Sequence, residues 1–158
     1  MEDNLFYRCE SCGNIFAKVD ASHGIDCCGK PMAPIVANTT DASREKHVPV
    51  PVKNNGKLVV TVGSVLHPMI QEHYIQWIAL ASENKLEIIY LKPGDEPKAT
   101  FLYAVPADEV KIVNFAENED EVPNCEGGPC NFKYNELVAD AVTIYEYCSI
   151  HGLWKITI

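Results

Sequence analysis

Short apolar runs recur along the chain from residue 45 onward, and clusters of turn-forming residues separate them. The runs cover residues 57–62, 74–81, 86–91, 100–105, 142–147 and 154–158. Asn54-Asn55-Gly56 is typical of a hairpin turn, and the alternation of valine with proline over residues 48–52 indicates an edge strand. Because the runs are strand-sized and regularly punctuated, the pattern predicts an all-β fold with an antiparallel sandwich over residues 45–158.

Residues 1–36 have a different pattern and predict a small separate unit. Residues 6–8 and 15–19 are strand-like, and cysteines follow each of them. A unit this short cannot bury enough surface to fold unaided, so we expect a bound metal ion to stabilise its fold. The candidate ligands are Cys9, Cys12, Cys27 and Cys28. Residues 37–44 are small and polar, and we interpret them as a linker.

The adjacent pair Cys27-Cys28 is less usual than a second Cys-x-x-Cys knuckle. Neighbouring side chains on a strand point to opposite faces, so both thiols can reach one ion only if the backbone bends there. Gly29 and Pro31 fit such a bend. Four sulfurs in a tetrahedron hold zinc or iron, and spacing alone slightly favours a structural zinc knuckle.

Composition narrows the class of protein. The formal net charge of −9 disfavours nucleic acid and anionic membranes as partners. No apolar run approaches the length of a membrane span, and the N-terminus has no signal-peptide pattern, so we expect a cytoplasmic protein. Seven cysteines are many for such a chain, and metal ligation is a better explanation for them than disulfides.

A second group of candidate ligands stands at the predicted strand ends. It consists of His47, His67, His73, Cys148 and His151. Pro68 favours an extended conformation at the preceding histidine, which helps to aim that ring. Any one of these histidines, taken alone, is more simply a hydrogen-bonded structural residue. Their shared position at predicted strand ends, with Pro68 and Gly152 directly after two of them, favours a second metal site.

Residues 114–138 interrupt the strand pattern and predict an insertion. The segment carries the acidic run 117–121 and a tight loop between Cys125 and Cys130. We favour free thiols or a local disulfide for these two cysteines, because they lack Cys-x-x-Cys spacing. A redox-active dithiol, or a docking surface for an electron donor, is the alternative.

Four motifs stand in order along the chain. They are Cys9-x-x-Cys12-Gly13-Asn14 with Cys27-Cys28-Gly29, then Glu45-Lys46-His47-Val48-Pro49, then His67-Pro68-Met69 through His73-Tyr74-Ile75-x-Trp77-Ile78, and last Glu146-Tyr147-Cys148-x-x-His151-Gly152-x-Trp154-Lys155. With these motifs the chain resembles a desulfoferrodoxin, a two-iron superoxide reductase. The resemblance spans nearly the whole chain except the insertion.

The resemblance implies two iron ions per chain. A desulforedoxin-like unit over residues 1–36 would bind one iron through its four cysteines. A neelaredoxin-like, immunoglobulin-like sandwich would bind the other. There the four histidines would lie in an equatorial plane and Cys148 would be axial.

The resemblance also implies roles for two neighbours of His47. Lys46 would attract superoxide and help to deliver a proton, and Glu45 would occupy the sixth position of the ferric iron. Without the motif, both would be ordinary surface residues. A rubredoxin-like carrier would re-reduce the iron, and the family commonly forms homodimers. The alternative is a non-catalytic electron-transfer or metal-binding module. An iron oxygenase is disfavoured because its two-histidine, one-carboxylate set is absent.

Overall fold

The computed structural model describes residues 5–18, 24–39, 46–82, 85–103, 112–114, 133–135 and 141–158. Within these ranges every regular element is a β-strand, which confirms the predicted all-β class. The strands are β1 (Phe6–Arg8), β2 (Ile15–Ala17), β3 (Asp26–Cys27), β4 (Lys30–Pro31), β5 (Ala33–Pro34), β6 (Pro49–Asn54), β7 (Lys57–Val62), β8 (Ile75–Ala81), β9 (Leu86–Tyr90), β10 (Lys98–Leu102), β11 (Ile112–Asn114), β12 (Lys133–Asn135), β13 (Thr143–Cys148) and β14 (Gly152–Thr157). Glu45, Cys125 and Cys130 lie outside the described residues, as does most of the predicted insertion.

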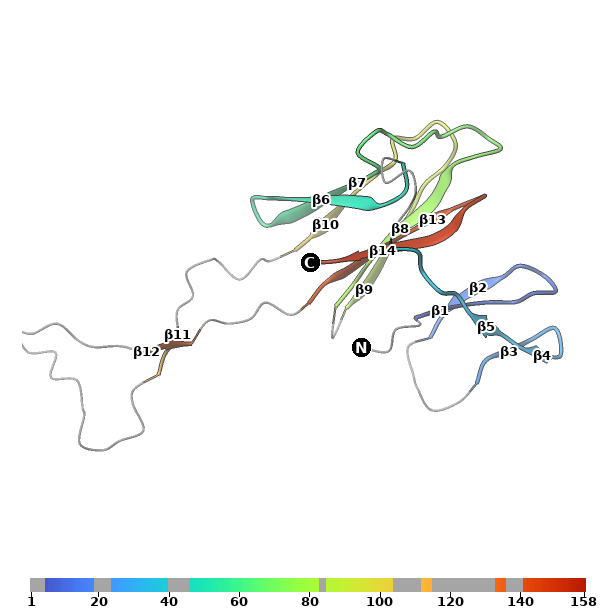
Figure 1. Ribbon diagram of the computed structural model, residues 1–158, viewed down its shortest axis with the longest axis horizontal. Helices are drawn as coiled ribbons and strands as arrows, with labels where there is room; N and C mark the ends of the chain where they lie inside the picture. The colour runs from blue at the N-terminus through green and yellow to red at the C-terminus, as the bar shows by residue number, and fades with distance from the viewer. Residues whose placement is uncertain are drawn as a thin grey trace, which may run out of the picture.

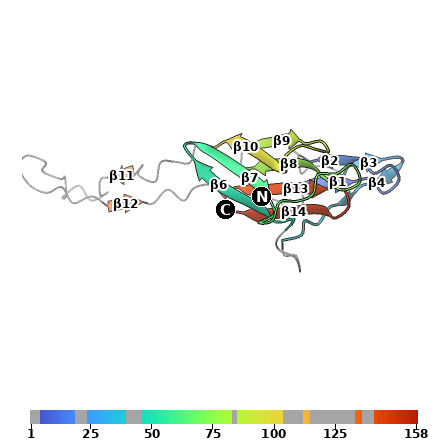
Figure 2. The ribbon, with the colours of Figure 1, turned by 90° about the horizontal axis from the view of Figure 1, so that it is seen from above.

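Two antiparallel sheets form the sandwich. One has the order β14-β13-β8-β9 and the other β10-β7-β6, so β6 is an edge strand as its prolines predict. Seen from above, β6 and β7 lie in front of the four-stranded sheet (Figure 2). Leu58 and Val60 of β7 pack between the sheets with Phe101 of β10 and Ile78 of β8. This layer is the main core of the molecule.

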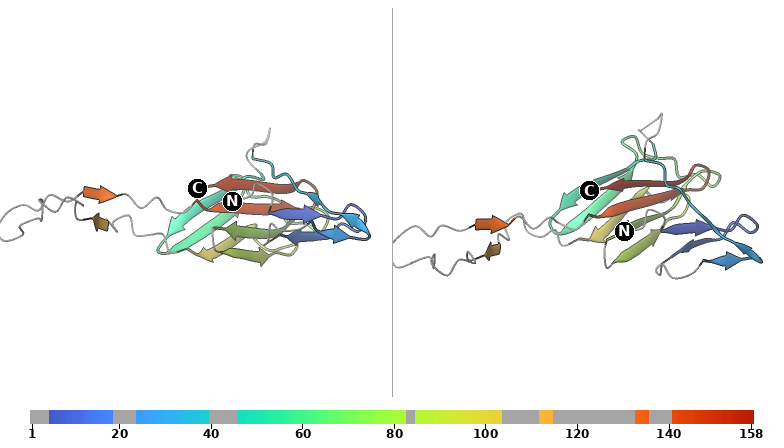
Figure 3. Two further views of the ribbon diagram at one scale, coloured as in Figure 1. Left: turned by 90° about the horizontal axis from the view of Figure 1, so that it is seen from below. Right: turned by 60° about the horizontal axis from the view of Figure 1, so that its bottom comes forward.

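The N-terminal unit covers the outer face of the four-stranded sheet. Its strands β2-β1-β5 form one small sheet and β3-β4 another, and both lie beside the sandwich (Figures 1 and 3). Phe6 packs against Trp77 and Tyr145, with ring centroids 4.8 and 5.2 Å apart. Both faces of β8 and β13 are therefore covered, which explains why every residue of β8 but Gln76 is buried.

The chain leaving the N-terminal unit runs along the free edge of β14. Asn38 pairs in parallel with Trp154 there. Its N–H donates to the carbonyl of Leu153 at 2.9 Å, and the N–H of Lys155 donates to its carbonyl at 2.9 Å. Part of the predicted linker is thus bonded to the sandwich.

The structure confirms the predicted hairpin turn, adds one strand pair that was not predicted and shifts one predicted strand. Asn55 and Gly56 both have positive φ, 45° and 75°, as a two-residue hairpin turn requires. β11 and β12, at the borders of the predicted insertion, pair antiparallel. The run expected at residues 100–105 forms β10 earlier, at Lys98–Leu102, where it pairs with β7.

Candidate metal centres

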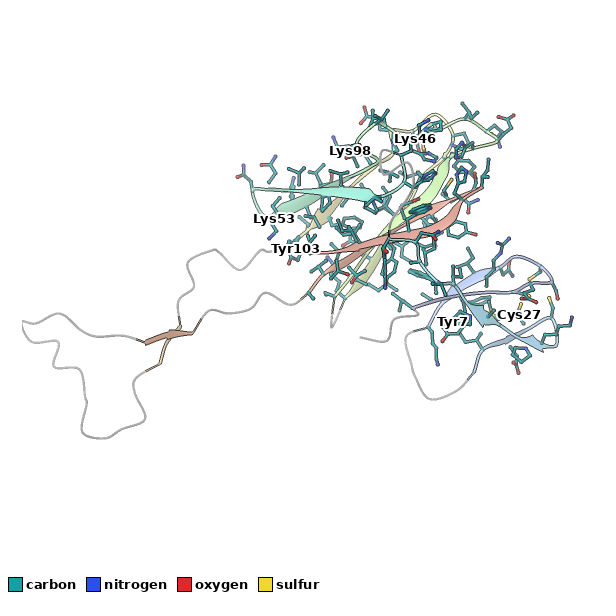
Figure 4. All side chains as sticks on the ribbon, viewed as in Figure 1. Tyr7, Cys27, Lys46, Lys53, Lys98 and Tyr103 are labelled. Atoms are coloured by element: carbon teal, nitrogen blue, oxygen red, sulfur yellow. The ribbon has the colours of Figure 1, made fainter. Side chains whose placement is uncertain are left out.

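Three loops bring the histidine-rich group together. His47 precedes β6, and His67 and His73 lie between β7 and β8. Cys148 ends β13, and His151 lies in the turn that leads to β14. One ligand atom from each of the five residues lies within 4.8 Å of all the others. Figure 4 marks this end of the sandwich by the neighbouring Lys46. Side chains more than 100 positions apart in the sequence thus converge on one point.

The β13–β14 hairpin aims the thiol and the last histidine. Cys148 pairs with Gly152, so residues 149–151 form a three-residue loop, and Gly152 takes the left-handed φ of 77° that closes such a loop. The pairing of β13 with β8 also shifts register between Tyr147 and Cys148. This irregularity ends the ladder at the thiol and turns the chain toward the site.

The four imidazole rings stand at the corners of a near-square. Successive ring centroids around it lie 5.0, 4.5, 4.9 and 4.5 Å apart, and a diagonal measures 6.4 Å. The order around the square is His47, His67, His73, His151. Neighbouring rings are inclined by 67° to 81°. Each ring therefore presents an edge, and with it a nitrogen, toward a common centre.

The donor atoms fit a first-row metal ion. Nε2 of His47 lies 2.9 Å from Nδ1 of His151, and two nitrogens held at right angles about 2.1 Å from an ion would be about 3.0 Å apart. Sγ of Cys148 lies 3.5 Å from Nε2 of His67 and 3.4 Å from Nδ1 of His151. An axial sulfur would stand about 3.1 Å from each such nitrogen, so only a small contraction is needed.

Hydrogen bonding sets which nitrogen faces the centre. Nδ1 of His67 lies 2.6 Å from the carbonyl of Pro68, which can only accept, so Nδ1 carries the proton and Nε2 is free to ligate. Nε2 of His73 is buried and has no hydrogen-bond partner among the described residues. A bound ion would satisfy this orphaned atom.

Burial favours the neutral form of two of the histidines, as ligation requires. Burial lowers the pKa of His67 to about 4, although the hydrogen bond to the Pro68 carbonyl by itself raises that pKa. Burial also lowers the pKa of His73, and the charges of His151, His47 and Lys46 lower it further. The nitrogens of His67 and His73 therefore meet little competition from protons near neutral pH.

The thiol of Cys148 is fully buried. Burial raises its pKa, the backbone N–H groups of His151 and Ile150 lower it, and the charge of Glu146 raises it. A positive ion at the centre would favour the thiolate, because it offsets the cost of burying that charge.

The site is closed on one side and open on the other. His47 and His67 are buried, whereas His73 is partly exposed and His151 is exposed. Lys46 is exposed and its charge is felt at His73.

The four-cysteine group is the second candidate centre. Sγ of Cys12 lies 3.6 Å from that of Cys27, which lies 3.9 Å from that of Cys28. Sulfurs at the corners of a tetrahedron around one ion would be about 3.8 Å apart. Cys28 and Gly29 have positive φ of 52° and 72°, which is the bend that brings adjacent thiols to one point. The fourth sulfur, that of Cys9, lies within 4.8 Å of the others.

The thiols of this group have unlike affinities for a proton. The backbone N–H of Cys12 lowers the pKa of Cys9 to about 6. Hydrogen bonding to Cys9 and Cys12 raises the pKa of Cys27 to about 12. All described cysteines are free of disulfides, as metal ligands must be.

Sequence reasoning missed two residues beside the histidine site. Trp154 stacks on His47, with centroids 4.9 Å apart and ring planes 17° apart. Glu146 is directly opposite Trp154 on the paired strands and is fully buried, and burial raises its pKa well above the ordinary value. Both residues belong to a motif noted in the sequence, but alternation alone gives no signal of their contacts.

The fold and the two sites define an all-β protein with a four-histidine, one-cysteine centre and a four-cysteine centre. Residues 39–157 match the family model described as Desulfoferrodoxin. The chain belongs to the desulfoferrodoxin family.

Individual relatives agree with this assignment. The chain is 38% identical over 153 residues to the desulfoferrodoxin of Syntrophotalea carbinolica, covering 94% of this chain and 92% of that one. It is 37% identical over 150 residues to the desulfoferrodoxin homolog of Archaeoglobus fulgidus, covering 94% and 93%. The crystal structure of the superoxide reductase from Treponema pallidum shares the fold, with a TM-score of 0.59, 22% identity and 99% of each chain covered. Among the described residues, no helix is long and apolar enough to cross a membrane.

Proposed function

We propose that this chain is a superoxide reductase that uses an iron ion at the histidine site to convert superoxide into hydrogen peroxide. The proposed iron ligands are His47, His67, His73, His151 and Cys148. One observation carries the proposal: four imidazoles form a near-square beside one buried thiol, and one side of the site stays open. A purely structural site would use every ligand position and stay closed.

The reaction balances as one superoxide, one electron and two protons giving one hydrogen peroxide. Ferrous iron at this site would supply the electron. No dioxygen forms, which separates this reaction from dismutation.

The chain's own groups would prepare the site in three ways. Neutral nitrogens from the histidines leave the ion its positive charge, which attracts an anion. The Cys148 thiolate would donate electron density to a bound iron from the buried side, as the thiolate does in haem-thiolate enzymes. Lys46, exposed beside the open side, would attract superoxide and help to deliver a proton. Glu45 would cap the resting site with its carboxylate.

The four-cysteine group would hold the second iron through Cys9, Cys12, Cys27 and Cys28. An electron carrier of the rubredoxin kind would re-reduce the enzyme, and the chain would act as a homodimer in the cytoplasm. The units we propose are residues 1–36, a linker at 37–44 and a sandwich at 45–158 with an insertion near 114–138.

Metal analysis and a rate measurement test the proposal together. We expect two irons per chain, a ferric-thiolate charge-transfer band and, after a pulse of superoxide, peroxide without dioxygen. Cys148→Ala should abolish the band and leave the four-cysteine iron in place. Zinc in the histidine site of the native protein, or dioxygen release, would contradict the proposal.

A further inference from the structure

The ring of His47 is bounded on one face by a flat partner. Trp154 lies nearly parallel to it, 17° between planes, whereas His67 and His151 meet it edge-on at 68° and 70°. An imidazole can turn about its last side-chain bond, and that torsion is only broadly restrained by itself. The stacked indole removes this freedom, because any turn would drive the imidazole edge into the indole face.

The indole contributes a flat face for stacking, and its N–H group makes no hydrogen bond within the described part of the chain. Trp154 is only 7% exposed, and its Nε1 has no hydrogen-bond partner in the described part of the chain. An unpaired buried N–H costs about 1–3 kcal/mol, which a phenyl ring at this position would avoid. The aromatic contact that the indole makes is the stack on His47.

The backbone that carries Trp154 is held from both sides. β13 pairs with β14 on one edge, with Glu146 opposite Trp154. On the other edge Asn38 bonds to the residues on either side of Trp154, at 2.9 Å for both backbone bonds and 3.3 Å from its Nδ2 to the Leu153 carbonyl. The segment from the N-terminal unit thus makes β14 an inner strand at this one point.

We propose that Trp154 is a positioning residue that fixes the ring plane of His47, and that Asn38 holds β14 so that the indole stays in contact. The proposal rests on the proposed function only in taking His47 as a metal ligand. A ring fixed in the ligating orientation loses less freedom when the ion binds, so the site binds metal more tightly. Losing a residue that orients a ligand typically lowers metal affinity about 10- to 100-fold.

Cobalt(II) binding to the full chain tests this, with the four-cysteine site first filled with zinc. We expect Trp154→Leu to weaken cobalt binding about tenfold or more and to change the visible spectrum of the site. Trp154→Phe keeps a flat ring, so it should stay within about twofold of the native affinity and restore the native spectrum. Trp77→Leu is the matched control, because it removes the other tryptophan, whose ring contacts within the described residues are with Phe6 and Tyr147 and not with a histidine.

Asn38 gives a second variant pair should Trp154→Leu fail to fold. Asn38→Pro removes the N–H that donates to Leu153, whereas Asn38→Ala keeps both backbone bonds. We expect the proline variant alone to show the weaker cobalt binding and altered spectrum.

Three outcomes would overturn the positioning role. They are Trp154→Leu matching Trp77→Leu in affinity and spectrum, Trp154→Phe behaving like Trp154→Leu, or a native chain that binds no cobalt at the histidines. A native chain that binds cobalt as expected but, with iron, fails to reduce superoxide would refute the enzymatic function and leave the positioning role standing.

Discussion

Ser149 and Tyr74 are joined by two hydrogen bonds. The N–H of Ser149 donates to the carbonyl of Tyr74 at 3.0 Å, and the N–H of Tyr74 lies 3.1 Å from Oγ of Ser149. Each residue adjoins a proposed ligand, since Cys148 precedes Ser149 and His73 precedes Tyr74. The two hydrogen bonds therefore hold the β13–β14 turn, which follows Cys148, against the β7–β8 connection, which carries His73, before any metal binds.

Ser149→Ala should loosen this tie. It removes the side-chain acceptor and leaves the backbone bond, so we expect unfolding free energy to fall by about 1 kcal/mol. Metal affinity at the histidine site should fall as well. Urea unfolding and cobalt titration measure the two effects. Ser64→Ala, which changes an exposed serine between β7 and His67, is the control. Equal behaviour of the two variants would refute the role of Ser149.

Lys46→Ala should slow superoxide reduction by about tenfold, because it removes the cation beside the open side of the site. The dependence of the rate on ionic strength should weaken in parallel. Pulse radiolysis at several salt concentrations measures both. Lys53→Ala is the matched control, since it removes the same charge from the exposed far end of β6 (Figure 4). An unchanged rate in Lys46→Ala would exclude its role in attracting superoxide.

Cys9→Ser should disturb only the four-cysteine iron. Cys9 belongs to the N-terminal unit, and the ligands of the other site all come from the sandwich and its loops. We expect one iron per chain, loss of the four-sulfur spectrum and largely intact peroxide formation. Ser11→Ala, in the same knuckle, should leave both irons in place. A lost reaction with the second iron still bound would show that the first centre is obligatory.

Acid should destabilise the metal-free protein through His67. Its pKa is about 4 in the folded state and 6.5 as the ordinary value, so the unfolded chain takes up a proton first. The stability is complete above pH 6.5 and is lost as pH falls toward 4, by at most about 3 kcal/mol. His67→Gln should remove this part of the slope in urea unfolding measured across that range.

The pH dependence of stability must be compared between His67→Gln and the wild-type protein, because Glu146 changes stability with pH in the opposite direction. Its raised pKa favours the folded state as pH falls, and it is present in both proteins, so the difference between them isolates His67. Parallel pH curves for the two proteins would contradict the prediction.

The strand pattern was readable where one face of a sheet is open to solvent. β7 alternates between exposed and buried positions, and its run was predicted with the observed bounds. The Asn55-Gly56 turn could be predicted because it needs only two neighbouring residues that tolerate positive φ. β8 and β13 lack alternation, because the N-terminal unit covers the face that would otherwise be polar.

The sequence by itself determined which side chains could serve as metal ligands, because residue type, spacing and the neighbouring prolines and glycines are local properties. It also determined that the backbone must bend at the Cys27-Cys28 pair if both thiols are to reach one ion. Only the tertiary structure decided that four imidazoles form a near-square, that Trp154 faces His47 and that Glu146 is buried opposite it. Those relations depend on how strands distant in sequence are registered and which face each turns inward, and a one-residue change of register would reverse them.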